Sequence, residues 1–181
     1  MWTLLWGDRM KQTRNLTQSA ILIALALALS YTERFIPLQL VIPLPGVKLG
    51  LANIVTLVAL YLLNWKQTLS IVLIRCVLGS LFGSLTGLLF SLTGGLLSLG
   101  VMTLCKKLPV FSIYGISILG AAAHNIGQIL AAMALMNSVY VCAYLPYLLL
   151  IGIFTGSATG ITCAGVLRAF KAVRISKEMN R

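Results

Sequence analysis

The stretch TLSIVLIRCVLGSLFGSLTGLLFSLTGGLLSLGVMTLC, residues 68–105, contains a single charged side chain, Arg75. One membrane-spanning helix uses about 20 apolar residues, so this stretch is too long for one helix and predicts two. We expect the break near Gly79 to Gly87. Lys66 precedes the stretch and Lys106 follows it, and a helical hairpin places these positive charges on one side of a membrane.

Four further apolar runs flank this pair, at residues 16–32, 49–63, 112–136 and 139–167. A loop rich in proline separates the first two, and a turn at Asn137 and Ser138 separates the last two. We therefore predict an all-α integral membrane protein, a six-transmembrane-helix bundle with cytoplasmic N- and C-termini. Its domain organisation is a basic cytoplasmic tail at 1–15, the transmembrane domain at 16–167 and a second basic cytoplasmic tail at 168–181.

Composition and charge agree with a multi-pass protein of a cell membrane, of the bacterial inner-membrane type. The 181 residues are 59% hydrophobic and 9% charged, whereas soluble domains carry about 25% charged residues. The net charge is +11, and most Lys and Arg residues lie beside the apolar runs. This is the distribution expected of cytoplasmic loops and tails next to a bilayer. It favours the membrane surface over nucleic acid as the partner of the positive charge.

Polar residues within the apolar runs are costly in a bilayer and so are candidates for function. Arg75 follows Lys66 by nine residues, about 14 Å along a helix, which places it near the membrane midplane. Gln128 lies one helical turn after His124, on the same helix face. Most of these groups fall in the outer half of the membrane. The candidate substrate-binding residues are Glu33, Lys48, Asn53, Arg75, His124, Asn125 and Gln128.

Two interpretations of these polar residues stay open. In the first, Arg75 forms a purely structural pair with Glu33, the only acidic residue outside the tails. In the second, which we favour, the residues line a cavity that opens outward beneath the proline-rich loop. Arg34, Lys48 and Arg75 outnumber the single carboxylate, so we expect a small ligand that carries an anionic group.

Small residues recur every four positions on the first and sixth runs. Such ridges let helices approach closely in lipid. The sixth-run ridge at 152, 156, 160 and 164 favours packing inside the bundle. The first-run ridge suits either internal packing or docking to another membrane protein, and its members are Ala20, Ala24 and Ala28.

Several kinds of chemistry lack the residues that they need. Asp8, in the N-terminal tail, is the only aspartate, so the carboxylates that hold Mg²⁺ on a diphosphate are missing. No Walker A segment is present to bind nucleotide phosphates, and the four cysteines form no CxxC pair. We therefore predict no catalytic residue, no metal site and no cofactor in this chain.

Three motifs resemble the family called Gx transporters, which is also labelled heptaprenyl diphosphate synthase component I. The resemblance covers roughly residues 12–170. The motifs are Glu33-Arg34-Phe35-Ile36-Pro37 with Pro45-Gly46-Val47-Lys48-Leu49-Gly50-Leu51-Ala52-Asn53-Ile54, Arg75 with Gly79-Ser80-Leu81-Phe82-Gly83, and His124-Asn125-Ile126-Gly127-Gln128.

That family in turn resembles the S components of energy-coupling factor (ECF) transporters. The resemblance implies capture of a small molecule from outside, and association with a transmembrane T component and two ATPase subunits that use ATP. It also implies that Ala20, Ala24 and Ala28 dock onto the T component. The alternative is a non-catalytic membrane accessory subunit in polyprenyl diphosphate or quinone biosynthesis. A standalone channel or exporter is a third, weaker hypothesis.

Overall fold

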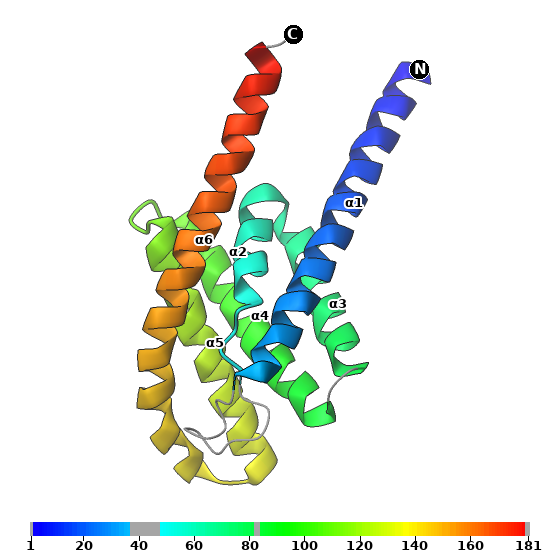
Figure 1. Ribbon diagram of the computed structural model, residues 1–181. Helices are drawn as coiled ribbons and strands as arrows, with labels where there is room; N and C mark the ends of the chain where they lie inside the picture. The colour runs from blue at the N-terminus through cyan, green and yellow to red at the C-terminus, as the bar shows by residue number, and fades with distance from the viewer. Residues whose placement is uncertain (1, 37–47, 82–83, 180–181) are drawn as a thin grey trace.

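The computed structural model describes residues 2–36, 48–81 and 84–179, without the side chains of 2–9, 11, 34 and 173–179. Within these ranges the chain is helical and has no strand (Figure 1). The proline-rich loop expected above the site lies outside the described residues, as does the Arg34 side chain. The elements are α1 (Trp2–Thr32), the 3-10 helix η1 (Glu33–Phe35), α2 (Asn53–Leu62), α3 (Trp65–Leu81), α4 (Leu85–Lys107), α5 (Ile113–Met136), the 3-10 helix η3 (Val139–Tyr144) and α6 (Leu145–Met179).

Local sequence signals set the helix ends. The long apolar stretch breaks between Leu81 and Leu85, as predicted. Ser84 caps α4, because its hydroxyl accepts a hydrogen bond of 3.1 Å from the Gly87 amide. The turn predicted after α5 is also confirmed, since Asn137 takes the left-handed conformation, with φ 46°, that often ends a helix.

Four helical segments are long and apolar enough to cross a membrane, namely Gln12–Thr32, Leu85–Lys107, Ile113–Met136 and Val139–Ala172. The membrane character predicted from composition is therefore supported. The other two helices are shorter, with 10 residues in α2 and 17 in α3. Helix α2 begins at Asn53, four residues later than the predicted run, and residues 48–52 form an irregular segment before it.

Helix α5 lies at the centre of the bundle, between α4 and α6. The small-residue ridge of α6 packs against it, as predicted: a Cβ added at Gly156 would lie 2.7 Å from the Cα of Ile118. On the other side, a Cβ added at Gly127 would lie 2.7 Å from the carbonyl oxygen of Thr93. Because these two positions are glycines, the backbone of α5 can pack directly against the backbones of α4 and α6.

Helix α1 lies at the edge of the bundle, against α2 and α3. In the apolar 18-residue stretch of α1, only 6% is buried, whereas 56% of the corresponding stretch of α5 is buried. Ala20, Ala24 and Ala28 are all exposed, whereas Ala26 on the opposite side is fully buried. The alanine ridge therefore faces away from this chain.

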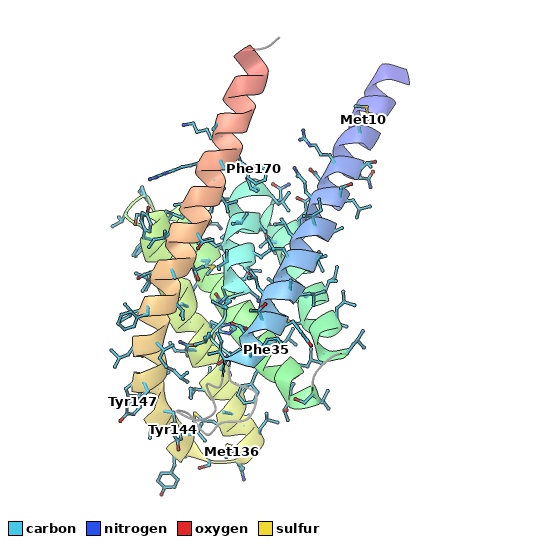
Figure 2. All side chains as sticks on the ribbon, viewed as in Figure 1. Met10, Phe35, Met136, Tyr144, Tyr147 and Phe170 are labelled. Carbon is cyan, nitrogen blue, oxygen red and sulfur yellow. The ribbon has the colours of Figure 1, made fainter. Side chains whose placement is uncertain are left out.

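The two ends of the bundle differ in character. Both termini lie at the same end (Figure 1). At this end the Lys106 ammonium donates a 2.6 Å hydrogen bond to the carbonyl oxygen of Leu60, in the last turn of α2. Tyr144, Tyr147 and Met136 lie at the opposite end (Figure 2). Tyrosine is typical of a membrane–water interface.

Candidate functional site

Several polar side chains are buried inside the bundle, near the end of α1 and the start of α2. All but Lys48 are less than 10% exposed, and Lys48 is partly buried. We call this group the polar cluster, and its members are Glu33, Lys48, Asn53, Arg75, His124 and Gln128. The structure thus brings together six of the seven substrate-binding candidates from the sequence.

Gln128 holds the irregular segment before α2 against α5. Its side-chain oxygen accepts a hydrogen bond of 3.3 Å from the Lys48 amide, and its nitrogen donates one of 3.1 Å to the Lys48 carbonyl. The Lys48 ammonium donates a 2.8 Å hydrogen bond to the hydroxyl of Ser91 on α4. One residue of the irregular segment is therefore bound to two helices.

Glu33 binds the same segment from the side of α1. Its carboxylate accepts a hydrogen bond from the Leu51 amide, beside the start of α2. Ala52, the N-cap residue of α2, offers no side-chain cap, so Glu33 supplies a negative group near the positive end of that helix. Burial raises the pKa of the Glu33 carboxyl, while this hydrogen bond and the charges of Lys48 and Arg75 oppose the rise. One carboxyl with a raised pKa therefore faces two cations.

The Arg75 side chain extends from α3 towards α2 inside the bundle. Its Nη2 lies 3.5 Å from the Oδ1 of Asn53, at the limit of a hydrogen bond. The α4 backbone approaches closely, since a Cβ added at Gly95 would lie 3.2 Å from Nη2. No direct ion pair with Glu33 is present among the described contacts, so the expectation of a purely structural Glu33–Arg75 pair receives no support.

The ring of His124 lies between two glycines. A Cβ added at Gly50 would lie 2.9 Å from the ring carbon Cδ2, and one at Gly94 would lie 2.7 Å from Nδ1. Gly50 also has φ +82°, a conformation that other residues rarely adopt. The other ring nitrogen, Nε2, lies 2.8 Å from the Nε2 of Gln128. The imidazole is thus fixed in place by α4, α5 and the irregular segment.

Asn125 does not join the polar cluster. Its amide nitrogen donates a 2.6 Å hydrogen bond to the carbonyl oxygen of Leu148, on α6. Successive side chains of a helix point in directions about 100° apart around its axis. His124 and Asn125 are neighbours in sequence and therefore face different partners. We assign Asn125 to the packing of α5 against α6.

The sequence reasoning missed the small residues that complete the site. Gly50, Ser91 and Gly94 contact the polar cluster. Gly50 lies within a quoted motif but was not selected as a site residue, and Ser91 and Gly94 resemble many other small residues in an apolar chain. For α4, the available signal was the adjacent pair Gly94-Gly95 in the middle of an apolar run, because two glycines there weaken a helix. Such a cost indicates close approach by another group, here His124 and Arg75.

Two buried atoms of the polar cluster have no hydrogen-bond partner, namely Nδ2 of Asn53 and Nε of Arg75. The Nδ1 of His124 lies against the α4 backbone at Gly94. Buried polar atoms without a partner are rare, and a missing water or ligand is one common reason. Within the part of the chain that the structure describes, no group of three His, Cys, Asp or Glu side chains could hold a metal ion.

A family model described as heptaprenyl diphosphate synthase component I matches residues 22–166 of this chain. The match includes α2 to α5 entirely, and every member of the polar cluster. The chain belongs to the heptaprenyl diphosphate synthase component I family. No curated protein and no solved structure matches the chain.

The family description agrees with one of the two labels that the sequence motifs indicated. It names a component of a synthase, which implies a second component as partner. A likeness to ECF S components is not among these matches, so a transport role rests on the geometry and on the sequence resemblance.

Proposed function

We propose that this chain is a non-catalytic membrane subunit that binds a small anionic ligand at the polar cluster and serves a partner protein. The main support is the unpaired nitrogen of the buried Arg75 guanidinium, with Lys48 nearby and a single carboxyl opposite. Two cations that share a single carboxyl leave an excess positive charge, which is costly in a membrane, and an anionic ligand lowers that cost.

For the topology we propose six crossings with both termini in the cytoplasm, in the plasma membrane of a bacterial-type cell. The common location of the termini (Figure 1) and the basic residues beside them support this orientation. Helices α2 and α3 are short for a crossing, but buried helices inside a bundle can be shorter than lipid-facing ones. The polar cluster then opens towards the outer half of the membrane.

The family description favours a role in polyprenyl diphosphate synthesis. In this role the chain holds the anionic diphosphate end of a prenyl substrate or product, and a separate synthase component performs the chemistry. An apolar prenyl tail matches the lipid-like surroundings of the bundle, while the diphosphate matches the cations of the polar cluster. No catalytic residue of this chain is needed.

The second candidate is an S component of an ECF-type uptake transporter, and the exposed face of α1 favours it. Ala20, Ala24 and Ala28 form a smooth surface that no other part of the described chain covers. A ridge of this kind allows a second membrane protein to pack closely. In this role a T component binds α1, and ATPase subunits supply the energy.

Purification of the tagged chain from its native membrane in mild detergent separates the two roles. We expect a prenyl diphosphate synthase subunit to co-purify if the accessory role is correct. An ECF T component with ATPase subunits supports the transport role instead. Recovery of the chain alone after chemical cross-linking in intact cells contradicts both roles.

A bulky residue on the alanine ridge tests whether α1 is the docking helix. We expect Ala24→Trp to reduce recovery of the partner at least tenfold, because an indole ring prevents close approach of two helices. Leu130→Trp is the control, since Leu130 is 54% exposed but lies on α5. Both variants should accumulate in the membrane as the original chain does. Unchanged partner recovery with Ala24→Trp means that α1 is not the docking helix.

A further inference from the structure

Glu33 is the anion of the polar cluster. Its carboxylate accepts a hydrogen bond from the Leu51 amide, just before the start of α2. Burial raises the pKa of this carboxyl, whereas the Leu51 hydrogen bond, the charges of Lys48 and Arg75 and the Gly50 amide lower it. Backbone amides at the start of a helix are a common binding site for oxyanions, and cations beside them strengthen it. In this chain a side chain of the protein itself occupies such a site.

The same turn carries buried donors that Glu33 does not satisfy. The Asn53 amide closes the turn with a 2.8 Å hydrogen bond to the Gly50 carbonyl, and a Cβ added at Gly50 would lie 2.9 Å from the Nδ2 of Asn53. Arg75 contacts the Oδ1 of Asn53 through its Nη2. Asn53 and Arg75 are at least nine-tenths buried, and the Nδ2 of the first and the Nε of the second have no partner. The Glu33 carboxylate therefore leaves two buried donors unpaired.

An external oxyanion at this turn must take the place of Glu33. The backbone N–H of Leu51 has one proton, which Glu33 already accepts. Two adjacent anions would also repel each other inside the bundle, where charges are weakly screened. Because Glu33 is tethered beside the turn, it competes at an effective concentration of about 1 mM or more. A ligand that binds the turn weakly at such a concentration is excluded.

Charge favours a ligand with at least two negative charges. Glu33 supplies one negative charge against the two positive charges of Lys48 and Arg75. A monocarboxylate that replaces Glu33 leaves the same excess positive charge. A phosphate-type dianion neutralises both cations, and it brings additional oxygen atoms for charge-assisted hydrogen bonds. The dianion therefore gains free energy in the exchange, whereas a monocarboxylate only replaces one carboxylate by another.

We propose that Glu33 is a built-in competitor, which a ligand must displace from the turn at Gly50 and Leu51, and that this competition restricts the site to oxyanions with at least two negative charges, such as phosphate and diphosphate groups. The proposal rests on the proposed binding function, and it names the ligand class and the residue that restricts it. A specificity of this kind depends on an unfavourable exchange for the wrong ligand as much as on contacts with the right one.

Glu33→Gln removes the competing charge and is expected to raise the affinity for inorganic phosphate and inorganic diphosphate by roughly tenfold or more. A glutamine oxygen can still accept the Leu51 hydrogen bond, so the turn keeps its contact with the end of α1. Because displacement of Glu33 costs every ligand the same free energy, both affinities should rise by the same factor. Isothermal titration of the protein in detergent measures them.

Asp8→Asn is the matched control, because it removes the same charge near the other end of α1. We expect its affinities to equal those of the original protein. An unchanged or lower affinity of Glu33→Gln, at the unfolding temperature of the original protein, overturns the proposal. A gain that is much larger for diphosphate than for phosphate also overturns it, because Glu33 then stays in place and repels the ligand.

Displacement can also be observed in the original protein, since Glu33 and Glu178 are its only glutamates. Protein labelled with ¹³C-glutamate gives two side-chain carboxyl NMR signals, and the signal that remains in Glu178→Gln belongs to Glu33. We expect diphosphate to shift the Glu33 signal and to leave the Glu178 signal in place. Binding of diphosphate without a shift of the Glu33 signal overturns the displacement, whatever the behaviour of the Glu33 variant.

Acetate and geranyl diphosphate define the ligand class. We expect acetate to bind the original protein roughly 100-fold or more weakly than inorganic diphosphate, and comparable affinities overturn the restriction to dianions. Much tighter binding of geranyl diphosphate than of inorganic diphosphate supports the proposal with a lipid-like ligand, and equal binding supports it with a free ion. If no probe binds the original protein or Glu33→Gln, the proposed function itself is wrong.

Discussion

Replacing Gly127 by alanine is expected to destabilise the bundle strongly. The new Cβ would lie 2.7 Å from the Thr93 carbonyl oxygen and 2.8 Å and 2.9 Å from the Cα and nitrogen of Gly94. These are backbone atoms of α4, so no side-chain rotation can relieve the overlap and the helices must separate. Overpacking typically costs about 1–3 kcal/mol, and we expect a loss near the upper end of this range. The separation would also displace His124, which lies one turn earlier on α5.

Thermal unfolding in detergent, followed by helical circular dichroism, measures this effect. Gly100→Ala is the matched control on α4, since nothing lies within 4 Å of its added Cβ. Alanine is favoured over glycine inside a helix by up to about 1 kcal/mol, so the control should leave the unfolding temperature unchanged or raise it. Equal unfolding temperatures for Gly127→Ala and the original protein contradict the close contact between α4 and α5.

Replacing Arg75 by alanine is expected to abolish most of the affinity for an anionic ligand. Removing one partner of a buried charge pair costs roughly 2–5 kcal/mol, which corresponds to a loss of about 30-fold to several thousand-fold in affinity. Arg75→Lys should recover only part of this loss, because lysine keeps the charge but not the planar array of donors. Isothermal titration with inorganic diphosphate measures both variants.

Arg168→Ala is the control for this experiment. Arg168 is an exposed arginine near the C-terminal end of α6, far along the chain from the polar cluster, and its loss removes the same formal charge. We expect unchanged affinity. If Arg75→Ala binds diphosphate as the original protein does, with the same unfolding temperature, then the polar cluster is not the binding site.

Much of the fold could be predicted because its signals are local. The serines that cap α4 and α5 and the asparagine that ends α5 act within a few residues of their own position. The late start of α2 could not be predicted in this way. The segment before it is held by hydrogen bonds from Glu33 and Gln128, which are distant in sequence. An apolar pattern indicates which residues avoid water, but it does not indicate which of those residues are outside a helix.

Most of the candidate residues lie close together in the structure, but their hydrogen-bond partners could not be predicted. Charged and amide side chains are rare in this chain, so Arg75 and His124 were easy to select. Their partners were not, because hydrogen-bond pairing depends on how α3 and α5 rotate against their neighbours. Asn125 illustrates the limit: it belongs to the same motif as His124, and it binds α6 instead.

The hydrogen bond between Glu33 and the Leu51 amide has a consequence for cooperativity. Glu33 follows α1 directly, so the helix that presents the alanine ridge also holds the segment that contacts His124 and Gln128. Under the proposed function, a partner protein that changes the position of α1 is therefore expected to change the affinity for the ligand. By thermodynamic reciprocity, the proposed ligand is then expected to change the affinity for that partner by the same factor. In this way, ligand binding at the polar cluster could alter partner binding at the alanine ridge without a large rearrangement of the helices.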